Sequence, residues 1–295
     1  MARYIAFAGD PEVRRTLLSR LDEHRAGGSL DHGGGRWTGT GGTASGCIAA
    51  SGDLKAFEAA TGYPGGLGLL LDYLCARIDD PQDAERLASD WLGRVAPGTD
   101  LTGVPGRLVA LMLADALDGE AWADDLQGVS EVLRAILALQ RRATGGDTPS
   151  RADWSAAQAA AITATDAIPD PLGQAFGALA EAAAWDPLIS RSTLTDTAAK
   201  WCSLRAFRAS RATGWTDQDE AAFRACTETF ERDVLAHDPT LRSYDFPSFF
   251  SAHEPELCAR FMKQLDHSNR AFLEAPEVLA RWGLDSLAAH TEPEA

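Results

Sequence analysis

The amino-acid sequence predicts a mainly α-helical protein: a multi-helical array with a small mixed α/β element at its N-terminus. From residue 65 onward, segments with apolar residues at helical spacing follow one another, separated by short polar stretches. Before that point, residues 3–8 are aromatic and β-branched and favour a short strand, as does the segment around Cys47. We expect domains at 1–62, 63–145 and 150–295, with one continuous helical domain as the alternative.

The first helices are predicted from their ends. Pro11 follows the potential cap Asp10 and begins a helix with an apolar stripe. Asp53 caps a later helix, which ends at the turn 62–64, Gly-Tyr-Pro. Between these helices, residues 27–46 are nearly half glycine, so this run cannot be helical and is expected to form a loop.

The rest of the chain reads as one helix after another. Ser150 with Asp153 and Thr216 with Asp219 have the spacing of capping boxes. The polar stretch 143–150 is the best linker, and the aromatic stretch 238–255 is expected to be irregular. Apart from an alanine-rich helix that starts after Ser150, helices are predicted at 67–78, 81–95, 104–118, 119–142, 171–185, 191–212, 216–236, 255–274 and 276–289.

Composition restricts the class of protein and its partners. The 295 residues are 45% apolar and 24% charged, which is typical of a globular protein. A net charge of −16 disfavours general binding to nucleic acid and to anionic membranes. The longest apolar run, 108–114, is too short to cross a bilayer, and the first residues lack the pattern of a signal peptide.

The five cysteines are odd in number and far apart, which is unlike a disulfide framework. They form no Cys-x-x-Cys pair and no Cys/His cluster, so no metal or other cofactor is expected. Free thiols in a reducing cytoplasm are the simplest interpretation, and we expect a cytoplasmic location.

Cys47 is the sharpest candidate for a catalytic residue. A nucleophilic thiol needs access and a lowered pKa, and backbone N–H groups of a glycine-rich loop can stabilise a thiolate or an oxyanion. His24 and His32 are the candidate bases, with Asp31 or Glu58 to orient one of them. The alternative is that Cys47 is a small buried residue beside a flexible loop.

An ordered set of residues in the first third of the chain resembles a family of bacterial and phage-associated proteins of unassigned function. The residues that carry the resemblance are His24-Arg25, Trp37, Gly42, Gly46-Cys47, Phe57-Glu58, Gly62-Tyr63-Pro64 and Asp72. The chain departs from the family where its first cysteine falls on Thr43 and where a histidine falls near Leu54. The resemblance implies a site in this region without its chemistry, with Trp37, Gly42, Thr43, Gly46 and Glu58 as ligand-binding candidates.

A second candidate lies in the predicted helix 191–212, where Arg205, Arg208 and Arg211 recur every third residue. We consider Arg205 and Arg208 as ligands for a phosphate, a carboxylate or an acidic partner. The alternative is internal pairing with the acidic residues between 217 and 220. Other patterns are weak: the glycine run lacks the lysine of a phosphate loop, and the acidic residues between 115 and 125 favour a solvated face over a magnesium site.

Two functions remain open. The first is a soluble helical interaction or accessory protein, in a phage-related or biosynthetic context, that binds a protein partner or a small polar molecule. The second is an enzyme that uses Cys47 for acyl or amide transfer. A concave pocket with Cys47 within reach of His24 or His32 favours the enzyme, and a buried Cys47 without a polar neighbour favours the interaction protein.

Overall fold

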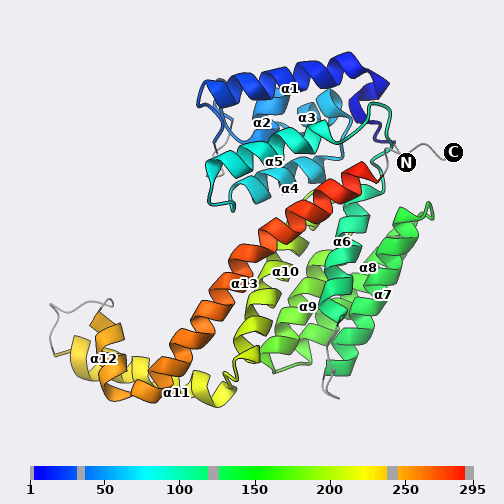
Figure 1. The fold of residues 1–295 in the computed structure, drawn as a ribbon. Helices are drawn as coiled ribbons and strands as arrows, with labels where there is room; N and C mark the ends of the chain where they lie inside the picture. Colours follow the sequence, from blue (N-terminus) through cyan, green and yellow to red (C-terminus); the bar gives the residue numbers. More distant parts are fainter. Residues whose placement is uncertain (1–2, 32–36, 119–125, 238–244, 290–295) are drawn as a thin grey trace. The chain divides into compact units, whose positions relative to one another are not determined.

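The computed structural model describes residues 3–31, 37–118, 126–237 and 245–289. These residues contain thirteen α-helices and no β-sheet, which confirms the mainly α prediction (Figure 1). The chain divides into two compact units. Unit 1 comprises Met1–Leu204 with Glu274–Ala295, and unit 2 comprises Arg205–Leu273. The domain boundaries expected near 62 and near 145–150 both lie inside unit 1.

The helices follow the order of the chain. Their bounds are α1 Pro11–Ala26, α2 Ala44–Ala49, α3 Leu54–Thr61, α4 Gly65–Cys75, α5 Pro81–Gly93, α6 Val104–Leu117, α7 Gln127–Thr144, α8 Arg151–Asp166, α9 Pro171–Ala183, α10 Thr193–Ala212, α11 Asp217–Phe230, α12 Phe246–His253 and α13 Pro255–Ala288. The bounds of α10 and α13 run through the division between the two units.

The predicted N-terminal α/β element is not supported. Residues 6–9 form a 3-10 turn, in which Phe7 and Ala8 adopt positive φ angles of 55° and 50°. The extended stretch before the turn pairs with residues 98–101 through a few backbone hydrogen bonds, including the isolated bridge between Ile5 and Asp100. A strand therefore does not propagate, although the residue types favour one.

Several helix ends agree with their predicted signals. Asp10 and Asp53 accept hydrogen bonds from the first turns of α1 and α3. Ser150 and Thr216 begin α8 and α11 with complete capping boxes. Each cap satisfies backbone N–H groups that have no partner inside the helix. These short polar signals place helix starts that apolar spacing alone leaves uncertain.

The C-terminal region differs from its prediction in two places. The stretch expected to be irregular contains α12, and its residues 238–244 lie outside the described part of the chain. The two helices predicted on either side of residue 275 are one continuous helix, α13, with Pro276 inside it. Proline usually breaks a helix because it removes a hydrogen bond to the carbonyl four residues earlier. Buried Ala275 and Leu279 on either side pack into the core of unit 1 and hold this stretch in helical conformation.

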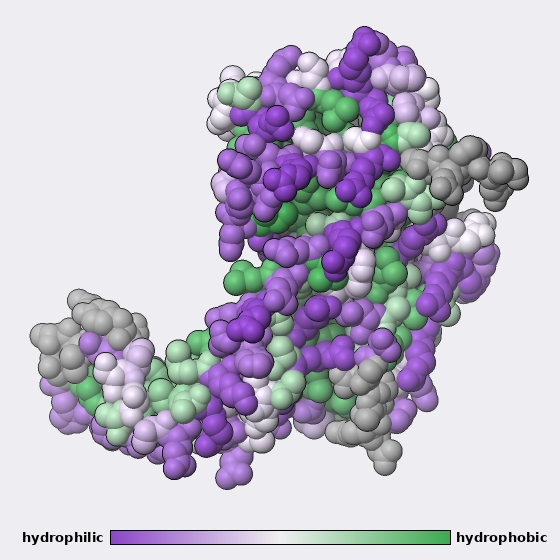
Figure 2. All heavy atoms as spheres, viewed as in Figure 1, coloured by the Kyte–Doolittle hydropathy of each residue, from purple (hydrophilic) through white to green (hydrophobic). Residues whose placement is uncertain are grey.

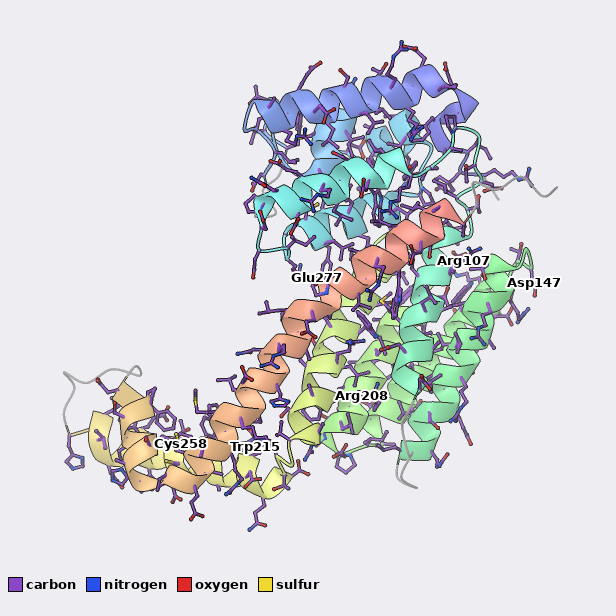
Figure 3. The ribbon with its side chains drawn as sticks, in the orientation of Figure 1. Arg107, Asp147, Arg208, Trp215, Cys258 and Glu277 are labelled. Atoms are coloured by element: carbon purple, nitrogen blue, oxygen red, sulfur yellow. The ribbon has the colours of Figure 1, made fainter. Side chains whose placement is uncertain are left out.

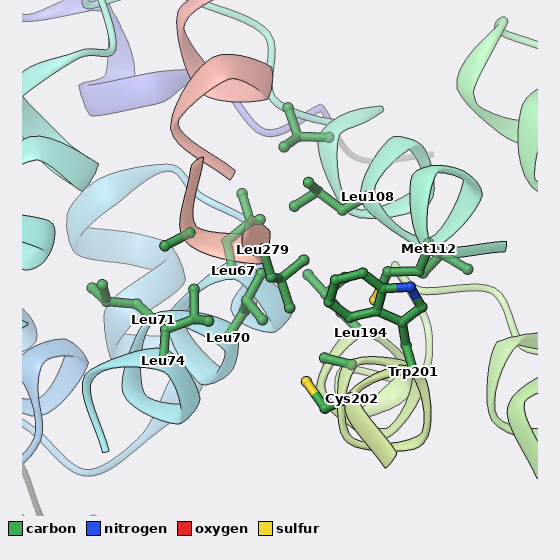
Figure 4. Close-up of a cluster of buried hydrophobic side chains, with 14 of the residues drawn as sticks. Leu67, Leu70, Leu71, Leu74, Leu108, Met112, Leu194, Trp201, Cys202 and Leu279 are labelled. Carbon is green, nitrogen blue, oxygen red and sulfur yellow. The ribbon is translucent and has the colours of Figure 1, made fainter. Parts of the chain in front are cut away.

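A large apolar core holds unit 1 together. Leu67, Leu70, Leu71 and Leu74 on α4 are fully buried, and Trp201 on α10 lies in the same cluster (Figure 4). The Trp201 indole contacts that of Trp282 at 5.1 Å between ring centroids, and its Nε1 donates to Asp115 at 2.9 Å. Hydrophilic side chains cover most of the face shown in Figure 2.

Unit 2 has a separate core made mainly of aromatic rings. Phe223 on α11 stacks on Phe261 on α13, with 4.4 Å between centroids and 5° between the ring planes. Trp215 and Cys258, labelled in Figure 3, belong to the same cluster. The other members are Cys226, Phe246, Phe249, Phe250 and Leu257. Ring contacts in place of aliphatic packing hold this small unit together.

Candidate functional site

Cys47 lies in a short helix and is enclosed. The segment predicted as a strand is α2, and the Cys47 side chain has 0% of its surface exposed. Its thiol donates to the Gly42 carbonyl oxygen at 3.4 Å. Burial raises the pKa of Cys47 to about 11, and the carboxylate of Asp72 also raises it. The thiol is therefore protonated at neutral pH, which makes it a weak nucleophile.

His24 lies near Cys47 through a shared neighbour, Ser29. The His24 Nδ1 is 2.8 Å from the Ser29 hydroxyl, and the Ser29 carbonyl oxygen is 3.9 Å from the Cys47 Sγ. Among the described residues no hydrogen bond joins His24 to Cys47 itself. His32, the other candidate base, lies outside the described residues. The structure thus places the thiol and one histidine in the same neighbourhood without the direct contact of a catalytic pair.

The ligand-binding candidates in and beside the glycine-rich run pack around α2. The ring of Trp37 meets the His24 ring edge-on, with 5.6 Å between centroids. A Cβ added at Gly46 would lie 3.4 Å from the Trp37 Cβ and 3.3 Å from the Thr43 hydroxyl, so the tryptophan packs directly on the helix backbone. Gly42 bonds through its backbone to Ser29. These contacts show that Trp37, Gly42 and Gly46 pack against neighbouring parts of the chain, which accounts for their spacing.

Thr43 and Asp72 hold the start of α2. The Thr43 hydroxyl accepts a hydrogen bond from Gly46 N at 3.4 Å and also bonds to the Asp72 carboxylate. That carboxylate accepts from the backbone N–H of Ser45 at 2.8 Å and from the Ser45 hydroxyl. Burial raises the pKa of Asp72, and the hydrogen bonds from Ser45 and Thr43 oppose this shift. Thr43, considered as a ligand residue, thus bonds inside the protein.

Glu58 also has partners within the protein. Its carboxylate accepts two hydrogen bonds from the Arg191 guanidinium and one, at 3.1 Å, from Gly65 N at the start of α4. Arginine and carboxylate in this two-bond geometry form one of the stronger pairs in proteins. With these three bonds, Glu58 joins α3, α4 and the segment before α10, and its side chain is 15% exposed.

The arginines of α10 lie in unit 2. Arg211 pairs with Asp217, as the interpretation of internal pairing predicts. Asp219 instead pairs with Arg260, which lowers the pKa of Asp219, and Glu220 accepts from the Trp215 indole at 3.2 Å. Arg205 and Arg208 also interact with other groups, so neither is free for a ligand; Arg208 is labelled in Figure 3.

A pocket forms elsewhere in unit 1, where the sequence does not predict one. It is an open pocket of about 600 Å³ between the first turns of α8 and the loop that follows α9. Asp147, labelled in Figure 3, marks the loop between α7 and α8. We call this the α8 pocket, and its lining residues are Pro149, Arg151, Trp154, Ser155, Gln158, Trp185, Asp186, Ile189 and Ser190.

The α8 pocket combines apolar walls with a few polar groups. Trp185 and Ile189 expose 49% and 79% of their surface, whereas Trp154 is 6% exposed. The Trp154 indole N–H is buried and has no hydrogen-bond acceptor among the described residues. Concave, mainly apolar sites of this size with few polar groups are typical of binding pockets.

The sequence gives a weak signal for this pocket. Trp154 lies in the predicted helix after Ser150 and Trp185 ends the predicted helix 171–185, positions where a tryptophan usually packs into a core. Trp154 is indeed buried, but Trp185 follows the last turn of α9 and faces solvent. The Asp-Pro sequence after Trp185 marks the end of that helix, but it does not indicate whether the ring is exposed.

No family model, curated protein or solved structure matches the chain. The resemblance of the first third of the chain to a bacterial and phage-associated family therefore stays a prediction. No helix in the described ranges is long and apolar enough to cross a membrane. The same residues contain no group of three or more His, Cys, Asp or Glu side chains placed to hold a metal ion.

Proposed function

We propose that this protein is a non-catalytic helical interaction protein that binds a partner protein at the α8 pocket. The observation that carries the proposal is the half-exposed Trp185 beside the exposed Ile189 at the mouth of a concave apolar site. Exposed tryptophans next to pockets are typical of the residues that dominate binding energy in protein interfaces. Ile162 on α8 is 51% exposed as well, but it does not line the pocket.

The cysteine enzyme is the less supported function. Its nucleophile is enclosed and its pKa is raised to about 11, whereas catalysis requires access and a lowered pKa. The Ser29, Thr43 and Asp72 groups near the thiol are hydrogen-bonded within the protein, and Glu58 on α3 bonds to Arg191. These hydrogen bonds support a structural role for the residues around Cys47. We therefore propose the partner site at the α8 pocket.

Affinity purification from the source cells tests the interaction. The intact protein is compared with Trp185→Ser and with Ile162→Ser, a matched variant that removes an exposed apolar side chain outside the pocket lining. We expect the recovery of one protein partner to fall at least tenfold with Trp185→Ser and to stay unchanged with Ile162→Ser. Equal recovery with all three proteins contradicts the proposed site.

Alkylation of the native protein tests the enzyme alternative. Iodoacetamide at pH 8 should modify the partly exposed Cys258 much faster than the enclosed Cys47. Peptide mass analysis after short exposure gives both rates, and the unfolded protein serves as the control in which the rates converge. Faster modification of Cys47 in the native protein supports the enzyme instead.

A further inference from the structure

We propose that the α8 pocket receives the side chain of a lysine from the partner protein. The inference rests on the proposed function, and it adds the chemical identity of the group that enters the site. Three features carry it: a buried carboxylate in the lining, two tryptophans beside it, and apolar walls suited to an aliphatic stem.

Asp186 supplies the negative charge. It is 8% exposed and lines the pocket. Its Oδ1 accepts from Leu188 N at 2.9 Å, and its Oδ2 accepts no hydrogen bond from the described residues. Oδ2 is not among the buried side-chain oxygens that lack a partner, so it is accessible and can accept a hydrogen bond from a bound group. A cationic donor in the pocket can form a charge-assisted hydrogen bond with this oxygen.

The neighbouring charges leave the Asp186 carboxylate unneutralised. Arg191, five residues later in the chain, places its guanidinium on Glu58. Arg151 lines the mouth of the pocket and is exposed, so solvent and salt screen its charge. A chain of net charge −16 attracts basic partners.

The geometry favours lysine over arginine. Asp186 has one oxygen already bonded and one open, which suits a single ammonium donor better than the two parallel donors of a guanidinium. The apolar surfaces of Trp154, Trp185 and Ile189 match the four-carbon stem of lysine. An ammonium close to the face of a tryptophan also gains from cation–π attraction.

The source of the ammonium is a polypeptide rather than a free amine. Trp185 and Ile189, which line the pocket and expose much of their surface, offer apolar contact to the peptide groups that flank a lysine in a chain. A simple alkylamine carries no such group. The two sources are therefore separable by the probe that is used.

Titrations of the full-length protein with small probes test the inference. Shifts of the indole ¹H–¹⁵N signals, with Trp185 assigned by its loss in Trp185→Ala, report binding. The probes are N-acetyl-lysine methylamide, its norleucine and glutamate counterparts, and n-butylammonium. We expect the lysine probe to bind at least tenfold more tightly than each of the others.

Variants identify the group responsible. Asp186→Asn keeps an oxygen that accepts from Leu188 N and removes the charge, so it should reduce the lysine-to-norleucine preference to about one. Trp185→Ala should weaken both probes, and Ile162→Ala should change neither. Unchanged far-ultraviolet circular dichroism shows that each variant is folded.

Three outcomes overturn the inference: equal or tighter binding of norleucine or glutamate, a lysine preference that persists in Asp186→Asn, or no saturable shift with any probe. Equal binding of n-butylammonium overturns the polypeptide source. If norleucine binds as well as lysine and Trp185→Ala abolishes both, the pocket binds apolar groups. In that case the proposed function stands and the lysine assignment fails.

Discussion

The Arg191 guanidinium donates two hydrogen bonds to the Glu58 carboxylate, from Nε to Oε1 at 2.8 Å and from Nη2 to Oε2 at 2.9 Å. The pair joins segments 133 residues apart in the chain. The Glu58 side chain is 15% exposed and that of Arg191 is 37% exposed, so solvent screens the pair only partly. Its contribution should therefore exceed that of a surface ion pair.

A double-mutant cycle with Glu58→Gln and Arg191→Ala should give a coupling energy of about 1–2 kcal/mol. The glutamine retains an oxygen for Gly65 N, so the cycle isolates the ion pair. Urea unfolding of the four proteins measures the coupling. The matched control is Arg142 with Asp147, both about half exposed, where we expect less than about 0.5 kcal/mol. Equal coupling in the two cycles contradicts the expectation.

Gly62→Ala should destabilise the protein by more than about 2 kcal/mol, because a left-handed conformation and a backbone clash act together. Gly62 has a φ of +70°, and an added Cβ would lie 1.9 Å from the Ile5 carbonyl oxygen. Gly93→Ala is the control, since its Cβ meets nothing within 4 Å and alanine favours helix by up to about 1 kcal/mol. Thermal unfolding of both variants gives the comparison, and similar melting temperatures would sink the prediction.

Asp72→Asn should lower the free energy of unfolding by about 1–3 kcal/mol, because the amide offers one acceptor where the carboxylate has two. The Ser45 N–H and hydroxyl both donate to this carboxylate. Ser45→Ala, which removes the hydroxyl alone, should cost about 1 kcal/mol. The exposed Asp79→Asn should stay within about 0.5 kcal/mol of the parent in the same denaturation assay. A larger loss for Asp79→Asn than for Asp72→Asn is incompatible with the described contacts.

Stability should fall as the pH rises from about 9 to about 11, because burial raises the pKa of Cys47 to about 11 from 9.0. In this window the unfolded state loses its thiol proton while the folded state keeps it, so the unfolded state binds fewer protons and rising pH favours it. Stability from this source is complete below pH 9. Cys75, with a pKa raised to about 12, acts in the same direction.

Cys47→Ala should make this alkaline loss shallower, as measured by urea unfolding at pH 8, 9 and 10. The variant should also cost about 1–2 kcal/mol at pH 7 through lost burial. The control is Cys258→Ala, in which the partly exposed thiol is removed. An unchanged pH dependence in Cys47→Ala shows that the thiol ionises alike in both states.

Helices and their caps were predictable because their signals are local. The Ser150–Asp153 and Thr216–Asp219 boxes need only neighbouring residues, and both form as predicted. The errors arise where distant packing decides. Pro276 stays helical against a buried core, and the Cys47 segment becomes helical where Asp72, on another helix, bonds to its first turn.

For the region around Cys47, the sequence predicted which residues lie close together better than it predicted their chemistry. His24, Trp37, Gly46 and Cys47 do come together, but the burial that governs thiol chemistry depends on neighbours that no local pattern specifies. The α8 pocket joins residues of α8 to a loop some thirty residues later. Whether a pocket forms between such segments depends on how the helices pack against each other, and the spacing of residue types along the sequence does not predict that packing.

The pairing of the first residues with the stretch before α6 affects how the protein forms during synthesis. Tyr4 N donates to the Thr102 hydroxyl over 98 positions of chain, and Phe7 is fully buried in the same neighbourhood. A ribosome adds on the order of 5–20 residues per second. The backbone groups of Tyr4 and Ala6 therefore lack their partners among residues 98–102 for several seconds, and during that time a chaperone can bind this extended end of the nascent chain.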